Sequence, residues 1–196
     1  MGHLTLAPGK KNARRRNAWL VFEDESGISL TPPVRRTWAP RGQTPVIHTP
    51  FNWKRMSMAA VLAFATDASE AKVMFSARPG AYNDTSLITF IRQLRRQLNG
   101  DKVTLIWDGL PSHRSRKMQA FLATQRFWLV VERLPPYAPD LNPVEGLWGN
   151  LKGTELANLC VDAISETEYH ARRGARRIRK EKDLAFAFLR HTGLSL

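Results

Sequence analysis

The sequence predicts an α/β fold in which helices flank a mixed five-stranded sheet, with a helical basic extension at the C-terminal end. Short runs rich in apolar and β-branched residues indicate the five strands, residues 19–26, 54–66, 71–77, 102–107 and 127–134. A polar turn joins the second strand to the third, which is typical of an antiparallel hairpin. A helical pattern precedes each of the last two strands, which favours parallel crossover pairing.

Composition limits the classes of protein that this chain can be. Its 196 residues fit one domain, and a hydrophobic fraction of 43% supports a folded core. Its net charge of +13 indicates a polyanionic partner, most often nucleic acid. The single cysteine, Cys160, excludes an intrachain disulfide or a cysteine-rich zinc site and fits a reducing compartment.

The same sequence gives no sign of a membrane partner. The longest apolar run, residues 58–65, is too short to cross a bilayer. The N-terminus carries charges where a secretory signal would need a long apolar segment. We therefore expect a cytoplasmic protein, which would be nucleoid-associated in a bacterium.

Residues 1–17 form a basic leader that includes Lys10, Lys11 and three consecutive arginines, Arg14, Arg15 and Arg16. This segment is either a flexible solvated leader or an arm that contacts DNA.

The first strand ends in an acidic cluster. Alternation places Asp24 on the same face as Leu20 and Phe22, and it places Glu23 and Glu25 on the opposite face. Buried strands seldom end in three acids unless a cation or solvent receives them. The cluster is therefore either an exposed strand end or part of a cation site, with Glu23 and Glu25 in a rim or structural role.

Residues 31–50 are rich in proline and arginine, and we expect a short strand around residues 36–39. Trp38 and the arginines Arg35, Arg36 and Arg41 are candidates for contact with DNA or another subunit. A plain surface loop is equally compatible with this composition.

A helix is expected from Asn83 or Asp84 to about residue 98, with Asn99 and Gly100 ending it. Its core stripe is Leu87, Ile88, Ile91, Leu94 and Leu98. The strand that follows ends at Asp108, at the carboxyl end where open α/β sheets place their sites. If this strand lies beside the first, Asp108 and Asp24 emerge at the same edge. His113, which follows Asp108 closely and precedes a helix over residues 114–124, either supports a site residue from behind, contacts a phosphate or has no direct role.

Residues 134–152 form a proline-rich loop that leads into a helix. Asn142 is a good N-cap, and Pro143 suits the first helical position. Glu145 is then either the glutamate of a capping box or a metal ligand at the mouth of a site. Lys152 lies on the same side of the helix as Glu145 and is either solvated or bound to a DNA phosphate. Four residues form the predicted core face of this helix: Val144, Leu147, Trp148 and Leu151.

The C-terminal extension, residues 161–196, is expected to be helical and is densely basic. Its basic stretch is either a solvated face or one that contacts DNA. The candidates for DNA contact are Arg172, Arg173, Arg176 and Arg177.

Asp24, Asp108 and Glu145 are three carboxylates with no histidine or cysteine cluster beside them. Oxygen ligands suit Mg²⁺ or Mn²⁺ rather than zinc. Two such ions would support phosphodiester cleavage, and the surrounding positive charge would recruit the DNA backbone.

Three motifs, FEDES, LIWDGLPSH and LPPYAPDLNPVEGLWGNLK, resemble the acidic signatures of DDE transposases of the insertion-sequence-630 and mariner superfamily. The resemblance implies an RNase H-like catalytic domain over residues 18–160, between the basic leader and the C-terminal extension. It also implies that Asp24, Asp108 and Glu145 form the catalytic metal-binding triad, holding two Mg²⁺ or Mn²⁺ ions. The implied activity is cut-and-paste transposition, with transposon ends and target DNA as partners and a homodimer as the assembly.

Two departures from that family's pattern stand out. Gly109 occupies a position where relatives often have asparagine, and no helix-turn-helix region precedes Asp24. We expect that region to be encoded separately or to be lost. The alternative function is therefore an inactive transposase remnant that binds DNA non-specifically.

Overall fold

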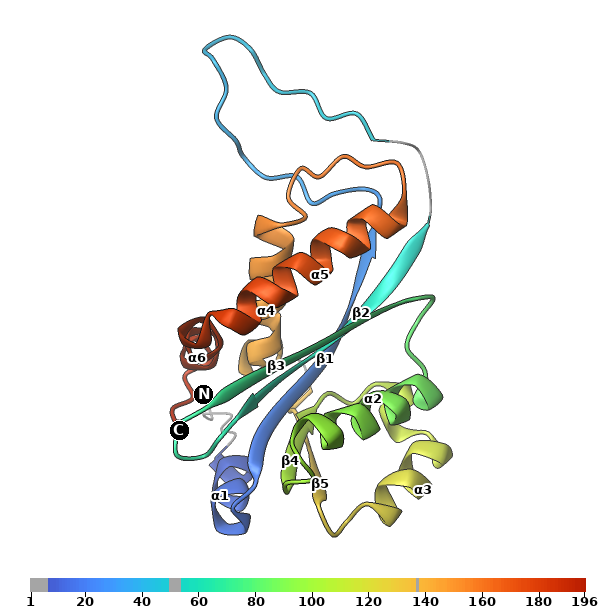
Figure 1. The fold of residues 1–196 in the computed structure, drawn as a ribbon, viewed down its shortest axis with the longest axis vertical. Coiled ribbons are helices and arrows are strands. Elements are labelled where there is room, and N and C mark those ends of the chain that lie inside the picture. Colours follow the sequence, from blue (N-terminus) through green and yellow to red (C-terminus); the bar gives the residue numbers. More distant parts are fainter. Residues whose placement is uncertain (1–6, 50–53, 137) are drawn as a thin grey trace.

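The computed structural model describes residues 7–49, 54–136 and 138–196 of the 196-residue chain. Five strands form one sheet in the order β3-β2-β1-β4-β5 (Figure 1). Their bounds are Trp19–Ser29 for β1, Arg55–Phe64 for β2, Ala71–Pro79 for β3, Val103–Trp107 for β4 and Leu129–Arg133 for β5. The pairs β1–β2 and β2–β3 are antiparallel, whereas β1–β4 and β4–β5 are parallel. The predicted mixed five-stranded sheet is confirmed.

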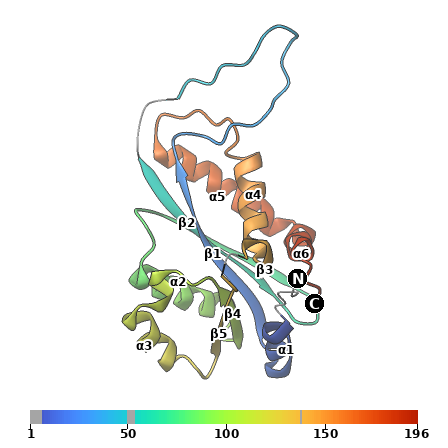
Figure 2. The same cartoon turned by 180° about the vertical axis from the view of Figure 1, so that it is seen from behind.

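Helices cover both faces of this sheet, as Figures 1 and 2 show from opposite sides. Even-numbered residues of β1, such as Phe22, pack in one core with helices α4, α5 and α6. Odd-numbered residues, such as Val21, pack in a second core with helices α2 and α3. The helices are α1 Ala7–Arg16, α2 Asp84–Gln97, α3 Arg116–Thr124, α4 Pro143–Thr154, α5 Ile164–Lys180 and α6 Lys182–His191. Short 3₁₀ turns, Pro111–Arg114 and Pro139–Leu141, precede α3 and α4. No helix in the described part of the chain has the length and apolar character needed to cross a membrane.

Helix α2 forms as its sequence predicts. Asn83 and Ser86 make a reciprocal capping box at its start. Asn99 and Gly100 end it with positive φ values of 54° and 82°. All five predicted core residues, Leu87, Ile88, Ile91, Leu94 and Leu98, are buried.

The basic leader is helical over residues 7–16 and packs against β1 and β4, so the flexible alternative is wrong for these residues. The guanidinium of Arg16 donates to the carbonyls of Val103 at 3.1 Å and Trp128 at 3.2 Å. Residues 1–6 lie outside the described part.

The strand expected around residues 36–39 is not formed, and residues 33–40 have no regular secondary structure. Prolines lack the N–H group that a strand ladder needs, which explains why this proline-rich segment does not pair. Figure 1 shows it as part of a long loop that extends away from the sheet. Its base is fixed by Asn158, which accepts from the Arg35 backbone N–H and donates to the Arg35 carbonyl, both at 2.9 Å.

The C-terminal extension is helical, as expected, and it packs on the sheet. Helix α5 crosses β3, and α6 contacts both β3 and α4 (Figure 1). Its apolar side chains complete the core on the Asp24 face of β1, and the buried ones are Ala171, Ala175, Ile178, Ala185, Phe188 and Leu189. The extension therefore covers apolar surface that the sheet and α4 would otherwise expose.

Candidate active site

The carboxyl ends of β1 and β4 lie side by side in the sheet. Phe22 pairs with Ile106 in parallel register, so Asp24 and Asp108 each follow the last pair by two residues. This confirms that the two strands are neighbours. Helix α4 packs against β1 and carries Glu145 in its first turn.

Asp24, Asp108 and Glu145 line one cavity of about 750 Å³. The other walls come from the loops after β4 and β5, and two arginines, Arg114 and Arg133, border the space. The structure thus brings together the three carboxylates that the sequence nominated. Although the three residues are far apart in the sequence, the parallel pairing of β1 with β4 and the packing of α4 on β1 bring them to the same cavity.

The Asp24 carboxylate is half-buried, and its Oδ2 accepts a hydrogen bond from the Trp148 indole N–H at 2.8 Å. Burial, together with the negative charges of Glu145, Glu25 and Asp108, raises the pKa of Asp24 to about 7 against the opposing effect of this bond. The three nominated carboxylates are therefore close enough to repel one another, and a bound cation would relieve that repulsion.

Asp108 is fixed by two donors. The backbone N–H of Leu110 donates to Oδ1 at 3.0 Å, and His113 Nδ1 lies 2.8 Å from the same oxygen. Burial acts to raise the pKa of Asp108, but these two bonds and the His113 charge outweigh it and lower that pKa below its ordinary value. Asp108 is thus ionised at neutral pH, whereas Asp24 is only partly ionised there unless a cation lies nearby.

The start of α4 excludes the capping role of Glu145. The Asn142 side chain accepts from the Val144 N–H at 3.1 Å, which confirms Asn142 as the N-cap. The backbone N–H of Asn142 donates to the Pro139 carbonyl at 2.8 Å, so it is already bonded and no capping box forms. The exposed carboxylate of Glu145 is therefore left for the cavity.

A second acidic group lies on the opposite face of β1. Glu23 and Glu25 point away from Asp24, as alternation predicts, but Glu23 is only 2% exposed and so is not a rim residue. Between them and Asp108 lies His113, whose Nε2 is 3.3 Å from Glu25 Oε1 and 3.8 Å from Glu23 Oε2. The sequence analysis missed this connection. The one signal for it is Pro111, which favours a tight turn and so returns His113 toward Asp108.

The predicted contact between His113 and DNA is wrong in this structure, because the residue is 2% exposed. Its ring stacks on Trp107 with centroids 4.0 Å apart. Burial acts to lower the pKa of His113, but bonds to Asp108 and Glu25 and the charge of Glu23 raise it to about 10. Burial raises the pKa of Glu23 well above its ordinary value, and the charge of Glu25 adds to the effect. A protonated imidazole therefore balances the acids of this second group.

The arginines nominated for DNA contact divide into two classes. Arg172 pairs with Glu168 at 2.6 Å and donates to the Ala77 carbonyl at 3.2 Å. Arg177 pairs with Glu155 at 2.7 Å and donates to Asn150 at 2.6 Å. Both are committed to contacts within the fold, whereas the remaining candidates are exposed: Arg35, Arg36, Arg41, Arg173 and Arg176.

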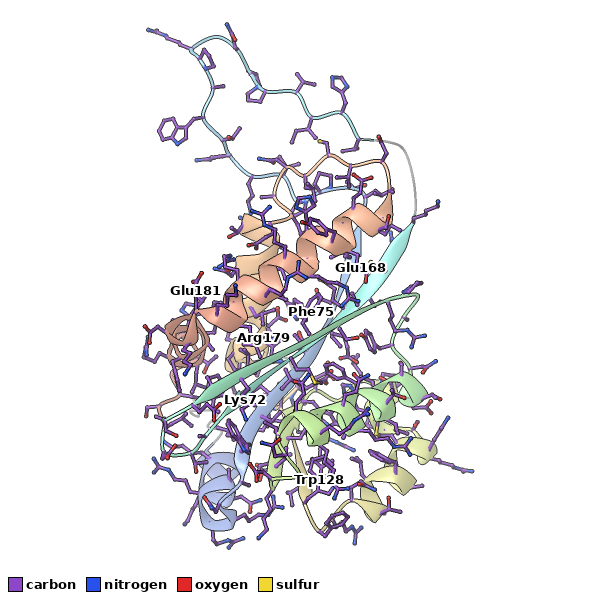
Figure 3. The ribbon with its side chains drawn as sticks, viewed as in Figure 1. Lys72, Phe75, Trp128, Glu168, Arg179 and Glu181 are labelled. Carbon is purple, nitrogen blue, oxygen red and sulfur yellow. The ribbon has the colours of Figure 1, made fainter. Side chains whose placement is uncertain are left out.

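Two further basic side chains hold the layers together. Lys152 donates to Ser26 Oγ at 2.7 Å, which joins α4 to β1 on the Asp24 face. Arg179, labelled in Figure 3 on α5, donates to the Val73 carbonyl of β3 at 3.0 Å. Basic residues in this chain therefore stabilise the fold as well as charge its surface.

Comparison with known proteins gives a family match and a curated relative. A family model described as DDE superfamily endonuclease matches residues 19–168. The 39 kDa protein of insertion element IS630 from Shigella sonnei is 32% identical over 141 residues, which cover 71% of this chain and 39% of that protein. The chain thus spans well under half the length of this relative.

Solved structures support the same fold. The Mos1 strand transfer complex matches with a TM-score of 0.54 and 18% identity, covering 95% of this chain and 59% of that chain. The Mos1 transposase catalytic domain with Raltegravir and Mn matches with a TM-score of 0.51 and 17% identity, covering 97% of this chain and 92% of that chain. At these identities the likeness shows the fold, and it confirms the expected RNase H-like architecture.

Proposed function

Because the chain belongs to the DDE superfamily endonucleases, we propose that it is a transposase catalytic domain that cleaves DNA and transfers the cut strand. The observation that carries the proposal is the convergence of Asp24, Asp108 and Glu145 on one cavity. Family membership alone would not distinguish an active site from an inactive remnant. Three carboxylates around one cavity supply the oxygen ligands that metal-dependent DNA cleavage requires.

The same three residues are proposed to hold two divalent cations, Mg²⁺ or Mn²⁺. All three offer carboxylate oxygens, the ligands that these hard cations prefer. The raised pKa of Asp24, caused by burial and by the neighbouring carboxylates, is what a site that binds cations would show in the protein alone. Mos1 paired-end complexes are known with Mn and with Mg, and that precedent favours the same ions here. When bound, such ions would polarise the scissile phosphate and activate the attacking hydroxyl or water.

The chain's own residues prepare this site. Trp148 holds Asp24 through its indole N–H, and Leu110 holds Asp108 through its backbone N–H. Helix α4 begins at the Asn142 cap, and in the described part of the chain no capping bond engages the Glu145 carboxylate. These contacts fix the carboxylates before DNA arrives, so little reorganisation is required.

Two features would bring DNA to the cavity: the positive charge of the chain and the exposed residues of the long loop after β1. The net charge of +13 favours a phosphate backbone, and Arg35, Arg36 and Arg41 lie exposed on the loop after β1. Trp38, also on this loop, is 100% exposed and offers a surface for DNA or a second copy of the chain. We propose transposon ends and target DNA as the substrates. We also propose a homodimer as the assembly and a helix-turn-helix part that is supplied separately.

Nicking of supercoiled DNA with Mg²⁺ or Mn²⁺ tests the proposal. Glu145→Gln should lower the nicking rate by about two orders of magnitude or more, since even the loss of an outer partner of a metal ligand costs 10–100-fold. Glu166→Gln is the matched control, because Glu166 is also exposed and occupies the same third helical position in α5. Cleavage that persists in Glu145→Gln or in excess chelator would refute the assigned site. Salt-sensitive DNA binding with no cleavage under either metal would identify a remnant instead.

A further inference from the structure

His113 joins the cavity to the buried acids behind it. Its ring lies flat on Trp107, with an angle of 4° between the two planes. Nδ1 faces the Asp108 side chain at 2.8 Å and the Asp108 carbonyl at 3.2 Å, while Nε2 faces Glu25 at 3.3 Å. The ring is thus held on one face and at both nitrogens, which leaves it little freedom to rotate.

We propose that His113 is a positioning residue that holds the Asp108 carboxylate in the orientation in which it binds a divalent cation. Glu25, on the far face of β1, contacts Nε2 and restrains the ring. The restrained ring in turn holds the Asp108 carboxylate at the cavity. This inference rests on the proposed function of Asp108 as a metal ligand.

The pattern of bonds on Asp108 supports a role beyond general stability. Asp108 follows the last residue of β4, so the sheet itself does not fix its side chain. Within the described part of the chain, the Leu110 N–H and His113 Nδ1 both bond to Oδ1. Oδ2 is therefore left for a ligand. A hydrogen-bond donor that fixes the orientation of a metal-binding side chain typically changes metal affinity by about 10–100-fold when it is removed.

The position of Glu23 fits the same arrangement. Among the described residues, neither of its buried carboxylate oxygens has a hydrogen-bond partner, and Oε2 lies 3.8 Å from His113 Nε2. Glu23 therefore adds a second carboxyl group on the Nε2 side of the ring, opposite to Asp108. The residue thus has a reason to be buried there that core packing does not supply.

This proposal is tested by measuring the binding of Mn²⁺ to the full chain without DNA. Calorimetry and the electron paramagnetic resonance signal of free Mn²⁺ both report the affinity. His113→Gln loses the donor at the Nδ1 position, and its Mn²⁺ affinity should fall by about 10–100-fold. His113→Asn places an amide N–H near the Nδ1 position, and its affinity should stay within about threefold of the wild type. Urea unfolding of both variants supplies the control. If His113 had only a structural role, the Mn²⁺ affinity of each variant would follow its free energy of unfolding, whether or not the variant keeps a donor at the Nδ1 position.

Nuclear magnetic resonance of the wild-type protein gives a second readout, separate from Mn²⁺ affinity. The Nδ1–H proton of His113, identified by its absence from His113→Asn, should shift in the nuclear magnetic resonance spectrum when Mg²⁺ is added. It should not shift in Asp108→Asn.

The possible results separate this inference from the proposed function. Equal Mn²⁺ affinity in His113→Gln and the wild type would overturn the positioning role and leave the proposed function intact. No Mn²⁺ binding by the wild type would overturn both. Binding that survives loss of Asp24, Asp108 and Glu145 but disappears with Glu23→Gln would also overturn the inference, because the buried acids would then be a metal site in their own right.

Discussion

Replacing Asp24 by asparagine should stabilise the metal-free protein at neutral and alkaline pH while it abolishes metal binding. Asparagine keeps an oxygen that can accept the Trp148 indole bond, which is 2.8 Å long in the structure, and it removes the charge. The substitution therefore isolates the electrostatic cost of the carboxylate.

The size of the effect follows from the pKa of Asp24. Burial and neighbouring acids raise it from 3.8 to about 7 in the folded protein. Between these two values the folded state binds more protons than the unfolded state, so stability falls as pH rises, and the full cost is present above about pH 7. Each pH unit corresponds to about 1.4 kcal/mol, which gives about 4 kcal/mol, or about 2 kcal/mol with screening by solvent in the cavity.

Equilibrium urea unfolding in chelator at pH 4 and pH 8 measures this cost. The variant and the wild type should have nearly equal stability at pH 4. At pH 8 the variant should unfold at a urea concentration higher by about 1 M or more. Asp101→Asn is the matched control, because exposed Asp101 also accepts an indole bond, from Trp19 at 3.0 Å. A stability difference that is the same at both pH values would refute the reasoning.

Two further predictions concern packing and charge. Gly146→Ala should destabilise the protein by about 1–3 kcal/mol in urea unfolding, because the added Cβ would lie 2.9 Å from Phe188 Cδ1. Gly149→Ala, in open space on the same helix, should stabilise it by about 0.5–1 kcal/mol, and equal effects would contradict this packing argument. Replacing both Arg173 and Arg176 by alanine should weaken non-specific DNA binding and reduce the slope of log K against log salt by about 2, as measured by fluorescence anisotropy. An unchanged slope would show that this face of α5 does not contact DNA.

The sequence determined those features of the site that depend on neighbours along the chain. Alternation in β1 separated Asp24 from Glu23 and Glu25, and the structure keeps them on opposite faces. Asn142 was identifiable as an N-cap because its side chain bonds to a backbone N–H only two residues away. Such contacts form wherever the local pattern allows them, so they can be read from a short window.

Other features depend on which backbone groups are already bonded when the chain has folded. The sequence left Glu145 with two roles, and the bond from the Asn142 N–H to the Pro139 carbonyl excluded the capping box. Similarly, the sequence indicates a surface charge at Arg177, but this side chain pairs with Glu155, the residue that caps the C-terminal end of α4. Neither partner can be chosen from composition, because several acceptors compete for each donor.

The sequence by itself determined the α/β order, the helix caps and the three carboxylates at the ends of their elements. Only the tertiary structure decided that His113 turns inward to Asp108 and that residues 7–16 pack on the sheet as a helix. The physical reason is one of range. Caps and alternation are satisfied within a few residues, whereas the burial of a histidine between strands depends on surfaces that exist only after distant segments have packed.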